Sequence, residues 1–145
     1  MFQRILIVCT GNICRSPVAA AMLRRRLPER DVASAGLGAL VGHGVAPQAR
    51  VLAEADGLEV ADHEARQLTQ EMLVTYDLVL VMSEGQRRAV GDIVPEALGK
   101  TLLLGRWLEG GKGISIPDPY RKSDTVFAHV HRLLTDATEA WVGKL

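Results

Sequence analysis

The chain has 145 residues, of which 48% are hydrophobic and 23% are charged, the composition of an ordinary globular protein. Lys and Arg together number 17, as do Asp and Glu, so the formal net charge is zero and no global field favours nucleic acid or an anionic membrane. The apolar runs are too short to span a membrane, and the N-terminus lacks the pattern of a secretory signal. We therefore expect a single domain over residues 1–145 that is monomeric and cytoplasmic, binds no nucleic acid and does not insert into a membrane.

The first predicted elements are a strand, a short loop and a helix. Residues 4–9 ("RILIVC") are almost continuously apolar and rich in β-branched side chains, which predicts a strand buried on both faces. Residues 16–27 ("SPVAAAMLRRRL") predict a helix that Pro28 ends. Ser16 is the expected cap of this helix and Pro17 falls in its first turn, where proline is tolerated.

The rest of the chain continues the alternation of strands and helices. In chain order, the sequence predicts a strand at 32–36, a helix within 46–58 that has Pro47 near its start and Gly57 just past its end, a short helix at 69–76 opened by Thr69 and a strand at 77–82. It then predicts a helix at 83–94, a strand at 100–104, a surface loop at 108–120 and a long helix at 123–145. Apolar strands alternating with helices favour an α/β fold: a small, doubly wound, four-stranded parallel sheet with helices on both faces, as in flavodoxin-like proteins. Ligands of such folds bind beyond the carboxyl ends of the strands.

Residues 9–16 ("CTGNICRS") follow the first strand at that position and contain both cysteines of the chain, Cys9 and Cys14. A short loop before a helix can turn its backbone N–H groups inward to bind an anion, and the helix adds the positive end of its dipole. Arg15 can donate to two phosphate oxygens at once, and Gly11 permits a backbone that a side chain would obstruct. We expect the same positive environment to lower the pKa of Cys9 from the usual ~8.5. A thiolate suits two-step phosphoryl transfer through a covalent thiophosphate, without a metal or cofactor.

A leaving aryl oxide or alkoxide also requires a general acid near neutral pH. The sequence offers Asp118 in "IPDPYRKSD", between Pro117 and Pro119, which stiffen the loop. Asp118 could protonate the leaving oxygen and then activate water for the second step. Tyr120 could form an aromatic wall against a phenyl ring.

These motifs together resemble the low-molecular-weight protein tyrosine phosphatase family. The resemblance includes "VCTGNICRSP", "DPY", "SAG", "HEARQL" and "YDLVLVM", and it covers nearly the whole chain. "SAGLGALVG" and "IPDPYRKS" are most similar to the bacterial branch that acts on tyrosine kinases of capsule and exopolysaccharide export. The resemblance implies the phosphotyrosine phosphatase I-like sheet, with Cys9 as nucleophile, Arg15 as phosphate clamp and Asp118 as proton donor. It also implies a tyrosine-autophosphorylating kinase as the partner and inorganic phosphate as the product.

The resemblance further implies roles for residues around the nucleophile. Asn12 would hold the loop in its strained shape, Ser16 would lower the thiol pKa, and Leu40 and Tyr120 would line the slot for the substrate ring. The complete set expected to bind substrate is Thr10, Gly11, Asn12, Ile13, Cys14, Ser16, Leu40 and Tyr120. Eukaryotic members often have an aromatic residue at the position of Leu40 and a second tyrosine at that of Arg121, so substrate preference is open.

Other residues keep more than one interpretation. Cys14 could form a reversible disulfide with Cys9 or could simply fill apolar space. Arg121 and Lys122 are candidates for attracting an acidic phosphopeptide. The remaining candidates are interpreted structurally: a hydrogen-bonding role is favoured for His63, Arg66 and Gln67, a surface or helix-face position for His43, His129 and His131, and a solvated helix face for Arg24, Arg25 and Arg26.

Two rival functions are compatible with parts of the pattern. A thiol-dependent arsenate reductase would need resolving cysteines, and the sequence has none beyond the loop. A non-catalytic phosphopeptide-binding module would bind phosphotyrosine tightly without releasing phosphate. The combination of Cys9, Arg15 and Asp118 favours the phosphatase.

Overall fold

The computed structural model describes residues 2–145. Its centre is a four-stranded sheet whose neighbouring strands all pair in parallel, in the order β2-β1-β3-β4. The strands are β1 (Arg4–Cys9), β2 (Asp31–Gly36), β3 (Leu78–Val81) and β4 (Thr101–Leu103). The helices are α1 (Arg15–Arg26), α2 (Pro47–Ala55), α3 (Gln70–Thr75), α4 (Glu84–Ile93) and α5 (Asp124–Val142), with a 3₁₀ helix, η1, at Pro95–Lys100. The predicted fold class is confirmed.

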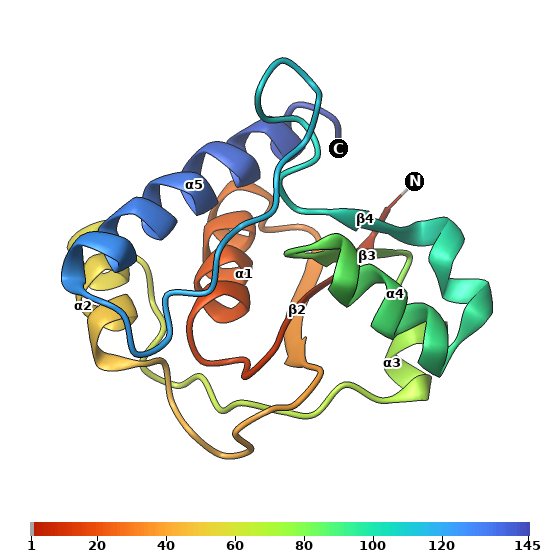
Figure 1. Cartoon of the computed structure of the whole chain (residues 1–145), viewed down its shortest axis with the longest axis horizontal. Coiled ribbons are helices and arrows are strands. Elements are labelled where there is room, and N and C mark those ends of the chain that lie inside the picture. Colours follow the sequence, from red (N-terminus) through yellow and green to blue (C-terminus); the bar gives the residue numbers. More distant parts are fainter. Residues whose placement is uncertain (1) are drawn as a thin grey trace.

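Helices cover both faces of the sheet because both faces of its central strand are apolar. Successive side chains of a strand point to opposite faces. In β1, Ile5 and Ile7 pack into the larger core with α1, α2 and α5, whereas Leu6 and Val8 pack into a second core with α3 and α4. Figure 1 shows α1, α2 and α5 on one side of the sheet and α3 and α4 on the other.

The start of α1 differs from the sequence prediction. Ser16 was expected to cap this helix, but the helix begins at Arg15, and Cys14 occupies the cap position without a side-chain cap hydrogen bond. The Ser16 hydroxyl instead contacts the Cys9 sulfur and accepts a hydrogen bond from the Asn12 amide. Contacts with the loop therefore override its local capping preference.

Side-chain caps open three other helices, and of these the one at Thr69 was predicted from the sequence. Thr69, Ser83 and Ser123 each accept a hydrogen bond from a backbone N–H in the first turn of α3, α4 and α5, respectively. Gly57 lies just past α2 with a positive φ of 77°, as its sequence position indicated. The 3₁₀ helix η1 was not predicted, because six residues are too few to show a helical periodicity.

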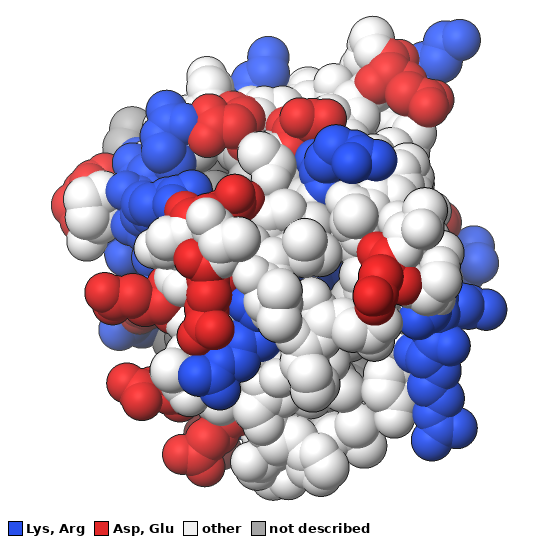
Figure 2. Space-filling model, turned by 90° about the vertical axis from the view of Figure 1, so that its left-hand side faces the viewer, with Lys and Arg blue, Asp and Glu red and all other residues white. Residues whose placement is uncertain are grey.

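Charge is dispersed over the surface. On the face in Figure 2, acidic and basic side chains are interspersed around an uncharged central region. Each residue of the Arg24–Arg26 run is exposed at the end of α1, as expected, and each also makes a hydrogen bond to a neighbouring element. Among residues 2–145, no helix is both long enough and apolar enough to cross a membrane.

Candidate active site

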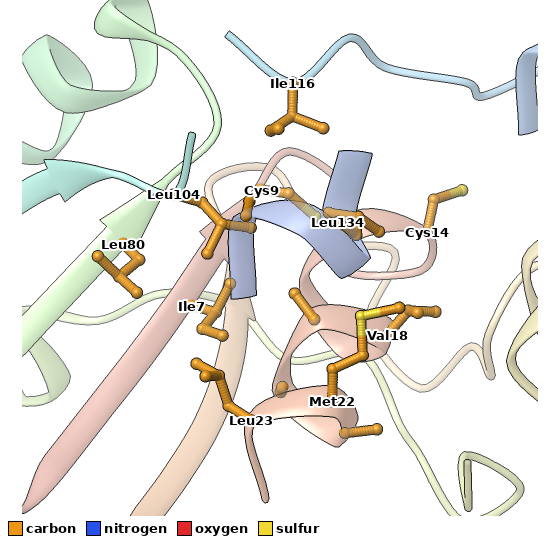
Figure 3. Close-up of a cluster of buried hydrophobic side chains, with 14 of the residues drawn as sticks. Ile7, Cys9, Cys14, Val18, Met22, Leu23, Leu80, Leu104, Ile116 and Leu134 are labelled. Carbon is orange, nitrogen blue, oxygen red and sulfur yellow. The ribbon is translucent and has the colours of Figure 1, made fainter. Parts of the chain in front are cut away.

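The loop that connects β1 to α1 positions Cys9 at the carboxyl end of the sheet. Cys9 is the last residue of β1, pairs with Gly36 of β2, and is only 2% exposed. Its Sγ lies 2.9 Å from Oγ of Ser16, which stands in the first turn of α1. Figure 3 shows Cys9 and Ile7, both of β1, among the buried side chains of the larger core. The sulfur is thus fixed between a strand end and the amino end of a helix, where the helix dipole favours negative charge.

The buried side chain of Asn12 fixes the conformation of this loop. The φ of Asn12 is 59°, in the left-handed region that asparagine tolerates better than most residues. The side chain is fully buried, and its Nδ2 donates to Oγ of Ser16 at 2.7 Å and to Oγ of Ser34 at 3.0 Å. Its Oδ1 accepts from the backbone N–H of Arg66 at 3.0 Å. The Asn12 amide therefore joins the loop, α1, β2 and a distant segment.

Two further contacts fix the same loop from other elements. The Nε2 of His63 lies 2.7 Å from the carbonyl oxygen of Asn12. Burial lowers the pKa of His63 below its ordinary value, and nearby Arg24 and Arg66 act in the same direction, against the opposing effect of that carbonyl. On the other side of the sheet, Gln86 of α4 donates from Nε2 to Oγ1 of Thr10 at 3.2 Å.

The loop after β2 lies against the Cys9 loop and brings Leu40 to it. Backbone N–H groups of Leu37, Gly38 and Leu40 donate to the carbonyl oxygens of Cys9, Thr10 and Gly11, at 2.9, 3.0 and 3.0 Å, respectively. The side chain of Gln67 holds this loop in turn, accepting from Ala39 N–H and donating to the Leu37 carbonyl. These contacts account for the structural role expected of Gln67.

Arg15 is the buried cation of the site. Its side chain is 5% exposed, and Nη1 donates to the carbonyl oxygen of Ile116 at 2.8 Å. Its Nη2 lies 3.6 Å from Oδ2 of Asp118. Within residues 2–145, no acceptor binds its buried Nε. A buried guanidinium with an unsatisfied donor is well suited to bind an oxyanion.

The segment after Ile116 carries Asp118 and Tyr120. Ile116 is buried, and its N–H donates to the carbonyl of Met82 at the end of β3, which ties the segment to the sheet. In Figure 3 its side chain points toward the cluster that includes Cys9. Oδ1 of Asp118 accepts from the N–H of Tyr120 at 3.1 Å, and the Asp118 side chain is 48% exposed. The carboxyl is therefore held at the border between Arg15 and solvent.

A pocket of about 160 Å³ lies where these three loops meet. Its lining residues are Cys9, Thr10, Gly11, Ile13, Cys14, Arg15, Gly38, Leu40, Asp118 and Tyr120. The lining combines a thiol, a buried guanidinium and a carboxyl with apolar and aromatic side chains, which fits a phosphate attached to a ring.

Cys14, like Cys9, is a free and buried thiol. Burial raises the pKa of Cys14 to about 12, and the proximity of Cys9 and Asp118 adds to the effect, against the opposing charge of Arg15. At neutral pH Cys14 is therefore a neutral thiol.

Most of the residues expected from the sequence meet at this pocket. Asn12 and Ser16 do not line it; both are fully buried behind the loop. Sequence reasoning missed Gly38, which lines the pocket, and Ser34 and Gln86, which hold the loop. Ser34 lies in the "SAG" motif, and that motif could have indicated its role in holding the loop. No local sequence pattern indicated a role for Gln86.

Comparisons with known proteins identify the family of the chain. Residues 4–145 match the family model described as low molecular weight phosphotyrosine protein phosphatase. The low molecular weight protein-tyrosine-phosphatase Etp of Escherichia coli K12 is 46% identical over 144 residues, which cover 99% of this chain and 95% of that protein. The crystal structure of the tyrosine phosphatase AmsI of Erwinia amylovora superposes with a TM-score of 0.95 at 43% identity, covering 100% of this chain and 94% of that one. Wzb of Vibrio vulnificus in complex with benzylphosphonate superposes with a TM-score of 0.95 at 42% identity, covering 100% of both chains.

The sheet, the pocket and these matches define a phosphatase. The chain belongs to the low molecular weight phosphotyrosine protein phosphatase family and is a protein-tyrosine-phosphatase of the Wzb and Etp type. The resemblance drawn from the sequence motifs is confirmed.

Proposed function

We propose that this chain hydrolyses protein phosphotyrosine through a phosphocysteine intermediate on Cys9, with Arg15 holding the phosphoryl group and Asp118 acting as general acid and then general base. The observation that carries the proposal is the meeting of these three side chains around one pocket of about 160 Å³. The residues that line the pocket fit a phosphotyrosyl side chain, with Arg15 for the phosphate and Leu40 and Tyr120 for the ring.

Binding comes first. The phosphate dianion lies against the backbone N–H groups of the loop and the guanidinium of Arg15, at the amino end of α1. Arg15 is held by the Ile116 carbonyl at 2.8 Å, so its orientation is fixed before the substrate arrives. Asp118, which lines the same pocket, stands beside the bound phosphate as the proposed proton donor.

In the first step the Cys9 thiolate attacks phosphorus. The S–P bond forms, the bond between phosphorus and the tyrosine oxygen breaks, and that oxygen takes the proton of Asp118. The Ser16 hydroxyl, whose Oγ lies 2.9 Å from the sulfur, donates a hydrogen bond to the thiolate before it attacks phosphorus and again when the S–P bond breaks. The backbone N–H groups and Arg15 stabilise the charge on the three equatorial oxygens.

In the second step water attacks the phosphocysteine. Asp118, now a carboxylate, takes a proton from that water, the S–P bond breaks, and inorganic phosphate and the thiolate are released. Asp118 is 48% exposed, so water reaches it without an opening of the loop. One carboxyl thus serves both half-reactions.

The partner we propose is a tyrosine-autophosphorylating kinase of capsule or exopolysaccharide export, acting in the cytoplasm with this chain as a monomer. Support comes from the similarity to Wzb, Etp and AmsI over nearly the full chain. The Vibrio vulnificus relative binds benzylphosphonate, whose ring and phosphonate resemble the end of a phosphotyrosine side chain.

The mechanism is tested with an Asp118→Asn variant and p-nitrophenyl phosphate, whose leaving group needs no protonation. Loss of the base slows the second step, so we expect a burst of one nitrophenolate per enzyme and phosphate bound to Cys9, detected by mass spectrometry after acid quench. When Cys9→Ser is added to Asp118→Asn, we expect neither the burst nor the bound phosphate. When Cys14→Ser is added instead, we expect the phosphate to remain bound to Cys9. A full rate in Cys9→Ser, or phosphate bound to Cys14, contradicts the mechanism.

The partner is tested separately with a purified, autophosphorylated tyrosine kinase of exopolysaccharide export. We expect its phosphotyrosine to be removed with a higher kcat/KM than that of an unrelated tyrosine-phosphorylated protein. Equal rates on both proteins would leave the phosphatase mechanism intact but contradict the proposed partner.

A further inference from the structure

The outer wall of the pocket contains a backbone conformation that its sequence does not favour. Residues 119–122 form a turn in which Lys122 N–H donates to the Pro119 carbonyl at 2.8 Å. Its third residue, Arg121, has a φ of 61°, in the left-handed region where glycine is normally preferred. A long side chain at this place adds strain that glycine would avoid, and such strain is concentrated at binding sites.

The guanidinium of Arg121 packs on the ring of Tyr120. Its Cζ lies 5.2 Å from the ring centroid, within the range of a cation–π contact. Tyr120 in turn lines the pocket and is 41% exposed. The arginine is therefore attached to the aromatic wall, at the outer edge of the site and not inside it.

The contact with the Tyr120 ring leaves the Arg121 side chain exposed to solvent. An exposed guanidinium of this kind can donate to a ligand that approaches from solvent. Arginine presents five N–H donors in a rigid fork that matches a carboxylate. The contact with the Tyr120 ring restricts the arginine side chain, so less freedom is lost when a carboxylate binds.

The opposite side of the pocket mouth has a different character. Leu40 lines the pocket and is 37% exposed, and the next residue, Val41, is 66% exposed. The loop that carries Leu40 is therefore apolar at these two residues, whereas the segment that carries Tyr120 presents the cations Arg121 and Lys122 outside the carboxyl of Asp118. A peptide bound across the pocket meets two chemically different sides.

We propose that Arg121 binds the carboxylate of an acidic residue close to the phosphotyrosine in the substrate chain, and so selects acidic sequences. The inference rests on the proposed hydrolysis of protein phosphotyrosine and adds a sequence preference to it. An extended peptide advances about 3.3–3.6 Å per residue, so the acidic residue stands within about three positions of the phosphotyrosine. Recognition by a stacked, exposed arginine contributes selectivity more than affinity.

The test uses phosphotyrosine peptides that carry one Glu, or Gln in its place, at each position from three before to three after the phosphotyrosine. The readout is the ratio of kcat/KM for the Glu and Gln peptides, measured within one variant, so any general loss of activity cancels. In the unaltered enzyme we expect about a two- to fivefold preference for Glu at one or two positions, as for an exposed ion pair. The preference should fall as salt is raised.

Three variants decide which residue is responsible. Arg121→Gln and Arg121→Gly are expected to bring the ratio to one, and the glycine variant, which relieves the positive φ, should fold at least as stably. Arg121→Lys is expected to keep part of the preference. Arg132→Gln, an exposed arginine of α5, is the matched control and should keep all of it.

The results that would refute the role of Arg121 differ from the result that would refute the proposed phosphatase function. If no Glu position is preferred, or the preference survives in Arg121→Gln, the inference is wrong. Loss of the preference in Lys122→Gln but not in Arg121→Gln also overturns it. Absence of phosphate release from every peptide would instead contradict the proposed function.

Discussion

Replacing Asn12 with alanine removes the side chain that joins the Cys9 loop to three other elements. The variant loses the bonds to Ser16 and Ser34, at 2.7 and 3.0 Å, and the bond from Arg66 N–H at 3.0 Å. It also leaves alanine at a φ of 59°.

The magnitude follows from these contacts. These three hydrogen bonds, two of them buried and one partly buried, contribute about 1 kcal/mol each. Alanine in the left-handed region costs a further ~1 kcal/mol or more. The free energy of unfolding should therefore fall by about 4 kcal/mol, a large part of the ~5–15 kcal/mol of a typical domain.

The assay is urea unfolding of three variants at this position, together with turnover of p-nitrophenyl phosphate. Asn12→Gly removes the backbone cost, so it should be about 1 kcal/mol more stable than Asn12→Ala. Asn12→Asp keeps an acceptor for Arg66 N–H but loses the donor to both serines. A displaced loop also misaligns its N–H groups, so kcat should fall by ~10²-fold in the alanine variant.

A destabilisation of Asn12→Ala below about 1 kcal/mol would refute this reasoning, because the three bonds would then contribute almost nothing. Equal stability of the alanine and glycine variants would show that the positive φ carries no cost. A normal kcat in a destabilised Asn12→Ala variant would show that the hydrogen bonds of Asn12 are not needed to align the loop for catalysis.

Three further predictions follow from the same site. Gly36→Ala should lower kcat, because its Cβ would lie 2.5 Å from the carbonyl oxygen of Thr10 and must push the loop away; steady-state kinetics measures this. His63 has a lowered pKa in the folded state, so the unfolded state binds more protons below the ordinary value of 6.5, and the free energy of unfolding falls as the pH drops through that value. His63→Gln should remove this slope in urea unfolding between about pH 5 and pH 7. Because the pKa of Cys14 is about 12, iodoacetamide at pH 8 should leave Cys14 unmodified, which peptide mass spectrometry measures.

Each of these has a result that contradicts it. Gly99→Ala, where a Cβ meets no atom within 4 Å, is the control for Gly36, and equal kinetics in both variants would exclude a steric effect on the loop. An unchanged pH slope in His63→Gln would assign the dependence to other groups. Equal labelling of both cysteines would contradict the protection of Cys14.

The strand, loop and helix that carry Cys9 and Arg15 could be predicted from the sequence because their signals are local. An apolar β-branched run, a short glycine-containing loop and an alanine-rich helix follow one another within the first 26 residues. The same locality explains one error. Ser16 has the chemistry of a helix cap, but contacts with Cys9 and Asn12 determine where its hydroxyl points.

The amino-acid sequence by itself determined the class of sheet, the order of elements and the chemistry available at residues 9–16 and 118. Only the tertiary structure decided that Arg15 meets Ile116, 101 residues further along the chain, and that Asp118 therefore lies 3.6 Å from the guanidinium. The buried network around Asn12 and the stacking of Arg121 on Tyr120 were settled in the same way. The physical reason is that hydrogen bonds and packing act over a few ångströms in space, whereas sequence patterns report only on neighbours along the chain.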